Sequence, residues 1–329
     1  MHLSVSSANY ACLKLLGMLR NFGVKVTPKD PAISIVIVSH NSGHILGDCL
    51  ERLPEAAEVI VVDNASGDDS VRVAEGYPVR LIGLPENVGY GRACNRGAEA
   101  ASGEFILFIN PDVRLEPGSI SKLAEAAERY PGAAAFAPRL LKPDGSIVFQ
   151  DSSILCSRPH NKSKPKHQPA GDCCVEAMSG AAMFCRREAF IGLGGFDERI
   201  FLYYEDDDLC RRLRKAGWSL VYVYGALGRH EHGKSTRSRK GAIYFRSFHW
   251  AGSKAYVTRK HNVAFHPAVE WFKSIIRGSL AALRCNSQRR ERHFGLAAGY
   301  WAVMTGGDRD RVPGFRAANR VQERRPVRQ

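Results

Sequence analysis

The chain has 329 residues, of which 44% are hydrophobic and 24% are charged, proportions that predict an ordinary globular protein with a full core. The lack of any uninterrupted apolar run of about 18 residues argues against a transmembrane span. Nine scattered cysteines without metal-type spacing favour a reducing cytoplasm over a disulfide framework.

The net charge of +14 is unevenly distributed along the chain. Residues 229–329 hold 22 Lys and Arg against 6 Asp and Glu, whereas residues 1–228 hold 25 against 27. A near-neutral domain therefore carries a basic tail. Such a tail predicts an anionic partner, which is either a nucleic acid or an anionic membrane surface.

Residues 1–31 are predicted to form an N-terminal extension. The segment ANYACLKLLGMLRNFGVKV has apolar residues near helical spacing, interrupted by Lys14 and Arg20, and it has no small-residue cleavage site typical of a signal peptide. One interpretation is an amphipathic helix that lies on a surface. The other is a helix packed on the domain, or a frayed extension.

From residue 32 onward, short β-branched or apolar runs alternate with helical patterns of about 10–15 residues. The predicted strands are 34–40, 58–66, 79–87 and 104–112, and the predicted helices are 44–55, 68–77, 89–103 and 119–130. This alternation predicts an α/β fold with a doubly wound, mostly parallel sheet flanked by helices. Ligands of such sheets bind at the carboxyl ends of the strands, where Asp63, Asn64, Asn110 and Asp112 fall.

The second half of the domain begins after a polar segment. Residues 151–174 are rich in Pro and Lys and are predicted to be a long mobile loop, either a functional lid or a variable surface insertion. A strand over 178–185, a short helix ending at Gly192 or Gly194, a helix through Lys215 and a strand over 218–225 follow. We therefore expect a main domain over 32–240, with a nucleotide-binding half over 32–150 and an acceptor half over 175–240. A region of basic amphipathic helices is expected over 241–329, with a disordered end.

The stretch FLYYEDDDLCRRLRKAGW holds four consecutive carboxylates, Glu205, Asp206, Asp207 and Asp208. Acidic residues at a helix N-terminus interact favourably with the helix dipole, which accounts for one or two of them. Four beside two tyrosines exceed that need. Mutual repulsion and partial burial raise a carboxylate pKa, and a raised pKa suits a general base.

Several other motifs allow two interpretations each. Asp63 and Asn64 are either nucleoside ligands or a turn cap, and Asp112, which follows Pro111, is either a ligand for Mg²⁺ or Mn²⁺ or a turn residue. The glycines around residues 89–97 either meet a diphosphate or permit tight packing. In HEHGKST, His230 or His232 is a candidate metal ligand or a solvated loop residue, and the upstream glycine of a phosphate-binding loop is missing.

Taken together, these motifs resemble those of bacterial family 2 glycosyltransferases, which are GT-A fold enzymes, and within that family the rhamnosyltransferase-like branch. The matching segments occur in the family's order over about residues 33–240: SIVIVSHNS, VVDNASGD, ENVGYGRACNRG, FINPD, MSGAAMFCRREAF, GGFDERIFLYYEDDDLCRRLRKAGW and HEHGKST. The resemblance implies inverting transfer of a sugar from a nucleotide-diphosphate donor to a hydroxyl, assisted by Mg²⁺ or Mn²⁺.

The resemblance also implies roles for individual residues. Donor-nucleotide contacts fall on Ser39, Asn41, Asp63, Asn64, Asn87, Gly89, Tyr90, Asn95 and Asn110. Sugar or acceptor contacts fall on Ser179, Gly180, Arg212 and Trp218, and metal ligation falls on Asp112 and His230, with His232 as the alternative to the histidine. Asp206 is the expected base, supported by Glu205 and Asp208, and the choice between Asp206 and Asp208 stays open. Asp207 is expected to serve as a cap or a solvent-facing residue, and Asp208 is expected to pair with Arg212 at i, i+4 spacing.

The predicted function is transfer of a sugar from dTDP-rhamnose or a UDP-sugar to a saccharide acceptor, lipid-linked by expectation, in cell-surface polysaccharide synthesis. The expected location is the cytoplasm, peripheral on the inner face of the cell membrane, with an anionic membrane surface rather than nucleic acid as partner. Two alternatives remain: a nucleic-acid-binding module, suggested by the basic tail, and a nucleotidyltransferase. The latter needs a basic, Gly-rich triphosphate loop where this chain has SHNSGHILGD.

Overall fold

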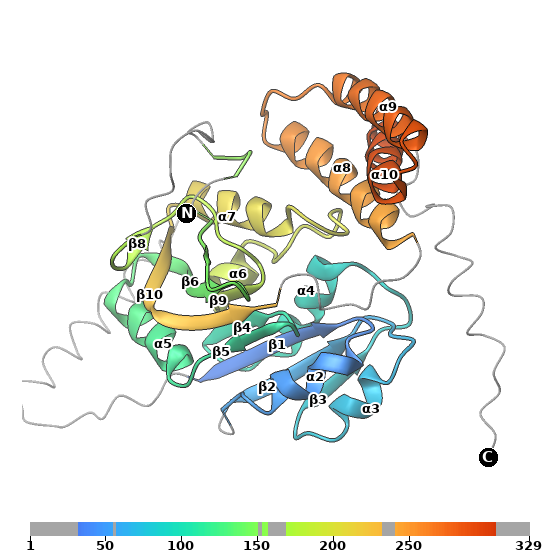
Figure 1. Cartoon of the computed structure of the whole chain (residues 1–329). Helices are drawn as coiled ribbons and strands as arrows, with labels where there is room; N and C mark the ends of the chain where they lie inside the picture. Colours follow the sequence, from blue (N-terminus) through green and yellow to red (C-terminus); the bar gives the residue numbers. More distant parts are fainter. Residues whose placement is uncertain (1–31, 55–56, 151–152, 157–168, 232–240, 307–329) are drawn as a thin grey trace, which may run out of the picture. The chain divides into compact units, whose positions relative to one another are not determined.

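The computed structural model describes residues 32–54, 57–150, 153–156, 169–231 and 241–306, which form a mixed sheet covered by helices (Figure 1). The strands are β1 (Ile33–Ser39), β2 (Glu58–Asp63), β3 (Arg80–Gly83), β4 (Phe105–Ile109), β5 (Val113–Leu115), β6 (Ala133–Leu141), β7 (Ile147–Val148), β8 (Cys173–Cys174), β9 (Ala182–Arg186) and β10 (Ser219–His230). Their order is β3-β2-β1-β4-β9-β6-β10-β5, with β7 beside β6 and β8 beside β10.

Nine helices lie in the described residues. They are α2 (Gly43–Leu50), α3 (Ser70–Ala74), α4 (Tyr90–Ala100), α5 (Ser119–Arg129), α6 (Arg187–Gly192), α7 (Glu205–Lys215), α8 (Ala242–Lys260), α9 (Pro267–Leu283) and α10 (Ser287–Met304). The predicted α/β fold with a helical C-terminal extension is confirmed. The predicted N-terminal helix, most of the loop over 151–174, His232 and the predicted disordered end lie outside the described residues.

Strand direction decides which residues share an edge of the sheet. Strands β3, β2, β1 and β4 pair in parallel, β9 is antiparallel to both β4 and β6, and β10 is parallel to β6. Six strands therefore point the same way, as predicted. Their carboxyl ends form one edge, together with the start of β9 and the start of β5, which is antiparallel to β10.

Two hydrophobic cores lie on the two faces of the sheet, because consecutive strand residues point to opposite faces. On β1, Ile35 and Ile37 join the core under α2, α3 and α5, while Val36 and Val38 join the core under α4, α6 and α7. Close packing of α4 depends on Gly97, where an added Cβ would lie 2.3 Å from a methyl group of Val36. Burial on both faces accounts for the continuous apolar runs of the parallel strands.

Some elements differ from the prediction. Strands β5, β6 and β7 were not predicted, and β10 continues five residues past the predicted end at 225. Part of the predicted 151–174 loop is ordered, since Cys173 and Cys174 form β8 against β10 and Leu155 is buried beside Ile200. No helix in the described part of the chain is long and apolar enough to cross a membrane.

Strand β10 is irregular where it passes β6. Val223 pairs with Pro138, but the next pair on β6 joins Arg139 to Leu227, so three residues of β10 bulge out of the ladder. Beyond the bulge, regular pairing resumes and also engages β5, where His230 lies opposite Val113. The bulge therefore sets which residue of β10 reaches the carboxyl edge beside β5.

The C-terminal helices pack closely on one another through glycines of α10. An added Cβ at Gly295 would lie 2.5 Å from the Tyr244 carbonyl oxygen, and one at Gly299 would lie 2.3 Å from that of Phe248. Helix α9 packs on α10 in turn, with Gly278 against the ring of Phe294. Together with residues 32–231, these helices belong to one compact unit.

Candidate active site

The carboxyl ends of β1 and β2 carry buried polar groups. Ser39 and Asp63 are paired residues of the parallel ladder, and both are buried. The Ser66 amide donates to Asp63 Oδ2 at 3.0 Å, whereas Asp63 Oδ1 and Ser39 Oγ accept or donate no hydrogen bond among the described residues. A buried polar atom without a partner is costly, so this strand-end pair is suited to a polar ligand.

Asn64 joins this strand end to the loop before α4. Its Nδ2 donates to Asn87 Oδ1 at 3.0 Å and to the Gly89 carbonyl at 3.3 Å, and its Oδ1 accepts from the Val88 amide at 2.9 Å. Nearby, Asn41 Oδ1 accepts from the Gly67 amide at 2.9 Å. The predicted donor residues Asn41, Asn64 and Asn87 are thus brought together, and their amides shape the loops of this edge.

The same loop is held against the segment that precedes α7. Gly89 has a φ of 90°, and an added Cβ there would lie 2.3 Å from the Phe201 carbonyl oxygen. The Tyr90 amide donates to that oxygen at 3.0 Å, and the Tyr90 hydroxyl donates to the Gly180 carbonyl at 3.0 Å. Gly89 is therefore required for close backbone packing, which is the tight-packing interpretation of these glycines.

Asp112 and His230, separated by 118 positions in the chain, meet at the carboxyl edge. Antiparallel pairing of β5 with β10 places His230 Nε2 at 3.4 Å from Asp112 Oδ1, and both residues are buried. The Glu231 amide donates to the Asp112 carbonyl at 3.0 Å, which fixes the two chains at this point. The topology has therefore brought together the two residues that were predicted as metal ligands.

Helix α7 starts from two consecutive residues in the left-handed region. Tyr203 and Tyr204 have φ values of 67° and 68°, which β-carbon-bearing residues rarely adopt. The turn places all four carboxylates in the first turn of the helix. Glu205 is buried, and its Oε2 has no hydrogen-bond partner among the described residues. Burial and then the neighbouring Asp206 raise the pKa of Glu205 well above its usual range.

Asp206 faces the loop that leads into β9. Its Oδ2 accepts from the Gly180 amide at 2.8 Å, and its Oδ1 accepts from the Asp207 amide at 2.9 Å. Burial raises the pKa of Asp206, and these backbone hydrogen bonds offset part of that rise. Ser179, whose Oγ accepts from the Ala181 amide at 3.3 Å, lies next to Gly180 at the same edge. A carboxylate held by two amides with a raised pKa is suited to accept a proton.

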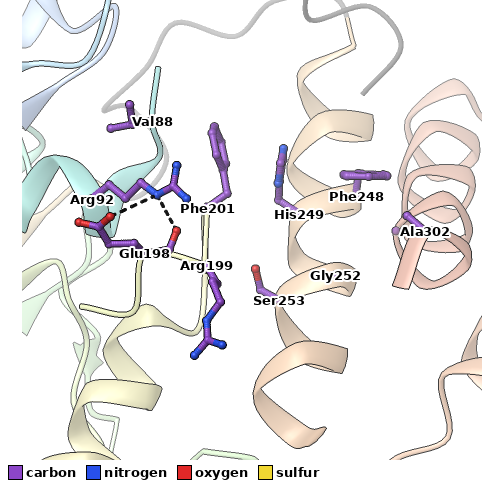
Figure 2. A pocket seen from close by; sticks show the side chains of 11 residues that line it. Val88, Arg92, Glu198, Arg199, Phe201, Phe248, His249, Gly252, Ser253 and Ala302 are labelled. Atoms are coloured by element: carbon purple, nitrogen blue, oxygen red, sulfur yellow. Dashed lines mark hydrogen bonds and ion pairs between the residues drawn. The ribbon is translucent and has the colours of Figure 1, made fainter. Parts of the chain in front are cut away.

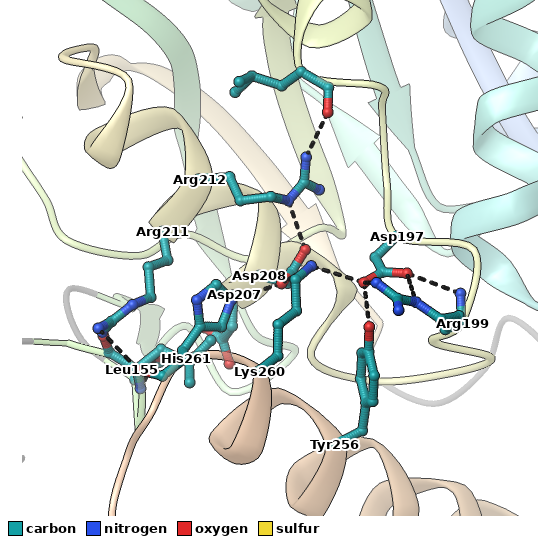
Figure 3. A network of polar contacts seen from close by, with 12 residues as sticks. Leu155, Asp197, Arg199, Asp207, Asp208, Arg211, Arg212, Tyr256, Lys260 and His261 are labelled. Carbon is teal, nitrogen blue, oxygen red and sulfur yellow. Dashed lines mark hydrogen bonds and ion pairs between the residues drawn. The ribbon is translucent and has the colours of Figure 1, made fainter.

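Asp207 and Asp208 turn away from this edge. Asp207 was predicted to serve as a cap or a solvent-facing residue, but it is buried, and Gln150 Nε2 donates to it at 3.3 Å. Asp208 is 0% exposed and is bonded to Arg212 at 2.7 Å, Lys260 at 2.6 Å and His261 at 2.7 Å (Figure 3). Burial would raise the pKa of Asp208, but these partners outweigh it and lower the pKa. The predicted pairing with Arg212 is confirmed, and a role as proton acceptor does not fit a sealed, ion-paired carboxylate.

The network around Asp208 continues to a second carboxylate. Lys260 Nζ also contacts Asp197 at 2.7 Å, and Asp197 further accepts from Tyr256 at 2.7 Å and Arg199 at 3.1 Å (Figure 3). Sequence reasoning missed Lys260, His261 and Tyr256. The only available signal was the change from the apolar part of α8 to the polar run RKHN at its end.

Three predicted site residues make structural contacts within the chain. Arg212 donates to the carbonyls of Leu193 at 3.0 Å and Gly195 at 2.7 Å, so its guanidinium holds the turn after α6. Trp218 comes after the C-terminus of α7 and before β10, at the opposite edge of the sheet from Asp206, and packs on the core. Contacts of Arg212 and Trp218 with an acceptor remain a prediction.

Asn95 is the third of these residues. Its Nδ2 donates to the Phe196 carbonyl and its Oδ1 accepts from the Phe196 amide, both at 2.9 Å, so its amide is occupied by backbone. Asn110 lies at the end of β4, where its amide donates to the Ala181 carbonyl at 2.9 Å. Asn110 thus stays at the predicted edge, and its contact with a donor remains a prediction.

A small hollow, open to solvent, lies beside these elements and was not predicted (Figure 2). Val88 and Arg92 line it near the start of α4, and so do Phe201 and His249, whose rings stack on one another with centroids 4.2 Å apart. Arg92 Nε donates to the Glu198 carbonyl at 2.6 Å. Phe248, His249, Gly252 and Ser253 of α8 and Gly299 and Ala302 of α10 also line the hollow.

Comparison with known proteins assigns the family. Residues 34–194 match the family model described as glycosyl transferase family 2. The chain is 33% identical over 287 residues to the N-acetylglucosaminyl-diphospho-decaprenol L-rhamnosyltransferase of Mycobacterium tuberculosis H37Rv, covering 76% of this chain and 90% of that protein. The chain belongs to glycosyltransferase family 2. Its relatives in this family are rhamnosyltransferase-like, since rhamnosyltransferase WbbL of Escherichia coli K12 is 28% identical over 69% of this chain and 93% of its own length.

Solved structures share the fold of this family 2 enzyme. A mannosyltransferase from Pyrobaculum calidifontis, in complex with GDP-Man and Mn²⁺, superposes with a TM-score of 0.51 at 13% identity, covering 92% of this chain and 97% of its own. TarS 1-349 of S. aureus, in complex with UDP, gives 0.50 at 14% identity, covering 84% and 92%. The sheet and its helices therefore form a GT-A fold.

Proposed function

We propose that the protein is an inverting, metal-dependent glycosyltransferase that transfers a sugar from dTDP-rhamnose or a UDP-sugar to a hydroxyl of a lipid-linked saccharide. Such a reaction belongs to cell-surface polysaccharide synthesis at the inner face of the cell membrane. The names of the Mycobacterium tuberculosis and Escherichia coli relatives support rhamnose as the sugar, and the decaprenol in the first name supports a lipid-linked acceptor.

The observation that carries the proposal is the position of Asp206. It is held by the Gly180 amide at 2.8 Å, at the edge where Asp63 ends β2, Asn110 follows β4 and Asp112 precedes β5. In this reaction Asp206 accepts the proton of the acceptor hydroxyl while that oxygen bonds to the anomeric carbon. The bond from the anomeric carbon to the diphosphate breaks in the same displacement, so the configuration inverts and no covalent intermediate is required.

Asp112 and His230 fit a divalent cation. One carboxylate and one imidazole, 3.4 Å apart at their nearest atoms, are compatible with an ion that takes its other ligands from water and the donor diphosphate. Within the described residues no cluster of three or more His, Cys, Asp or Glu side chains is arranged for a metal. When bound, Mg²⁺ or Mn²⁺ stabilises the negative charge that develops on the leaving diphosphate.

The test is transfer by the purified protein from dTDP-rhamnose and a panel of UDP-sugars, with Mn²⁺, to a lipid-linked saccharide. Asp206→Asn keeps the shape of the side chain but removes its basicity, so we expect the turnover rate to fall by about 10²–10⁴-fold with KM for the donor nearly unchanged. Asp112→Ala should instead weaken donor binding, measured as a smaller thermal shift with nucleotide-sugar and Mn²⁺.

The control is Glu125→Gln, which neutralises an exposed carboxylate of α5 and should retain the wild-type rate. If Asp206→Asn and Asp112→Ala both retain wild-type rates, the assigned roles are incorrect. If no nucleotide-sugar shifts the unfolding temperature of the wild-type protein, the proposal of nucleotide-sugar transfer fails before any residue is tested.

A further inference from the structure

Helix α9 has a buried face of small residues and, opposite to it, an exposed apolar face. Ser274, Gly278 and Ala281 are buried, and this face packs on α10 through Gly278 and Phe294. The opposite face presents five large apolar side chains that are between 44% and 82% exposed, and we call them the α9 stripe: Val269, Phe272, Ile276, Leu280 and Leu283. A soluble surface helix needs only one apolar face, so the stripe requires a separate explanation.

The spacing of the α9 stripe shows that it is one continuous surface. At 3.6 residues per turn, its five positions fall within about 80° of the helix circumference. The three buried positions lie on the other side of the helix axis. Because the buried side of α9 packs on α10, the stripe faces away from α10 along the length of α9.

Positive charge lines one side and one end of the stripe. Lys273, Arg277 and Arg284 follow it along α9, and Arg289 and Arg290 continue the charge at the start of α10, all of them exposed. Lys273 has one acidic partner, Glu270, at 2.9 Å. The pKa of His293 on α10 is lowered by burial and then by Arg277, Arg292 and Arg289, which shows that arginines of both helices create positive potential in one place.

We propose that the α9 stripe and its basic rim form a docking surface for an anionic lipid bilayer. Apolar side chains enter the boundary between headgroups and acyl chains, and flanking Lys and Arg bind the anionic headgroups. A second copy of this chain is a poorer occupant, because two copies paired through the stripe would bring the basic rims of both together. An anionic bilayer complements apolar and cationic groups at once.

This inference deepens the proposed function. It rests on that proposal only for the reason why the protein binds a bilayer, which is that a lipid-linked acceptor lies there. Its physical basis is independent of the sugar.

The test is cosedimentation of the full-length protein, without donor or acceptor, with vesicles of phosphatidylcholine alone and with a fraction of phosphatidylglycerol. We expect binding to the anionic vesicles that weakens with salt. Phe272→Ser/Leu283→Ser should lower the partition coefficient at least about tenfold, since the apolar area that enters the bilayer is lost. Arg277→Gln/Arg284→Gln should reduce binding to anionic vesicles and remove part of its salt dependence.

Matched controls separate the surface from general effects. Ile191→Ser removes an exposed apolar residue of α6, and Arg72→Gln removes an exposed arginine of α3, and both should bind within about twofold of wild type. All variants should keep the wild-type unfolding temperature and its shift with nucleotide-sugar and Mn²⁺. Such a result shows that the fold and the donor site are intact whether or not vesicles bind.

Three results would overturn the proposal. The first is no binding of the wild-type protein to anionic vesicles, and the second is wild-type binding by the Phe272→Ser/Leu283→Ser variant. The third is a dimer in sedimentation equilibrium that dissociates in this variant, since the stripe would then belong to a second copy. None of these results depends on the identity of the sugar, so they are distinguishable from a failure of the proposed transfer reaction.

Discussion

Four consecutive carboxylates occupy four different environments within one helical turn. Glu205 is buried and has no cationic partner in the described part of the chain, Asp206 accepts from two amides, Asp207 meets Gln150, and Asp208 is enclosed by three cationic or imidazole groups. Successive residues of a helix point about 100° apart, so each of the four meets a different neighbour. The chemistry of such a run is therefore set by the helix angle and cannot be assigned from residue type.

Glu205 offers a test by stability. The pKa of Glu205 is raised in the folded protein, so burying its neutral form costs no stability below the unfolded-state pKa. As pH rises toward and through the folded-state pKa, the unfolded state loses the proton first, and the folded protein loses stability relative to it. Glu205→Gln removes that penalty. We expect the variant to unfold about 2–4 °C above wild type at pH 8, and the difference to disappear near pH 4. Thermal unfolding followed by circular dichroism across this range measures it.

The control for Glu205 is Glu128→Gln, an exposed carboxylate of α5 that should show no such pH-dependent difference. A Glu205→Gln variant that is less stable than wild type at pH 8 would mean that the carboxylate is charged in the folded protein and bound to a cation. The burial argument would then be incorrect.

At the scale of elements, the site depends on the approach of the β9 loop to the start of α7. An added Cβ at Gly180 would lie 3.3 Å from the Asp206 Cβ, closer than most such contacts. Gly180→Ala should therefore push Asp206 away without removing its carboxylate. We expect the turnover rate to fall about tenfold or more, because displacement of a catalytic group by a fraction of an ångström is costly, with little change in donor KM.

The measurement is steady-state kinetics over pH, because a displaced Asp206 that loses its Gly180 hydrogen bond should also move the acid limb of the profile. Gly192→Ala on α6, where an added Cβ meets nothing within 4 Å, is the matched control. Wild-type kinetics for Gly180→Ala would show that this contact does not position Asp206.

Prediction from the sequence worked for elements with a strong period and for residues placed by topology. The β-branched runs of β1 and β2 are found, and the rule of carboxyl ends brings Asp63, Asn64 and Asp112 to one edge. Strand β6 was missed because AAAFAPRLL is rich in alanine and contains a proline. Strand β10 was ended early because Gly225 and Gly228 interrupt its pattern.

Contacts between distant segments could not be predicted. Asp208 and Lys260 are 52 positions apart, and no local pattern indicates that the end of α8 reaches α7. The same holds for Arg212, which fits an acceptor site by residue type but is taken up by two backbone carbonyls. Such assignments follow from the packing of the whole chain.

At the scale of the whole molecule, one lysine connects the C-terminal helices to the sheet and its covering helices. Lys260 bridges Asp197 and Asp208, so it holds the segment before α7 and α7 itself (Figure 3). Lys260→Met keeps the apolar stem but leaves both carboxylates short of a partner. We expect a loss of about 2–3 kcal/mol in the free energy of unfolding at pH 7, measured by urea denaturation.

The sign of the pH dependence follows from the pKa of Asp208. That pKa is lowered because its partners outweigh burial, so the stability is present above the unfolded-state pKa and is lost as pH falls through the folded value. The difference between variant and wild type should therefore narrow in acid. Arg72→Met, which breaks an exposed ion pair, should change the free energy by less than about 0.5 kcal/mol, and an equal loss in both variants would rule out the bridge as a special contact.

The bulge in β10 makes the composition of the proposed metal-binding pair, Asp112 and His230, sensitive to chain length. Between Val223 and Leu227, β10 holds residues that have no paired residue on β6. The number of these residues determines which later residue of β10 reaches each position of the ladder. Deleting one residue there would move Glu231 into the place of His230 opposite Val113. A single-codon deletion far from any catalytic residue would thus exchange an imidazole for a second carboxylate, and an insertion would place Arg229 beside Asp112.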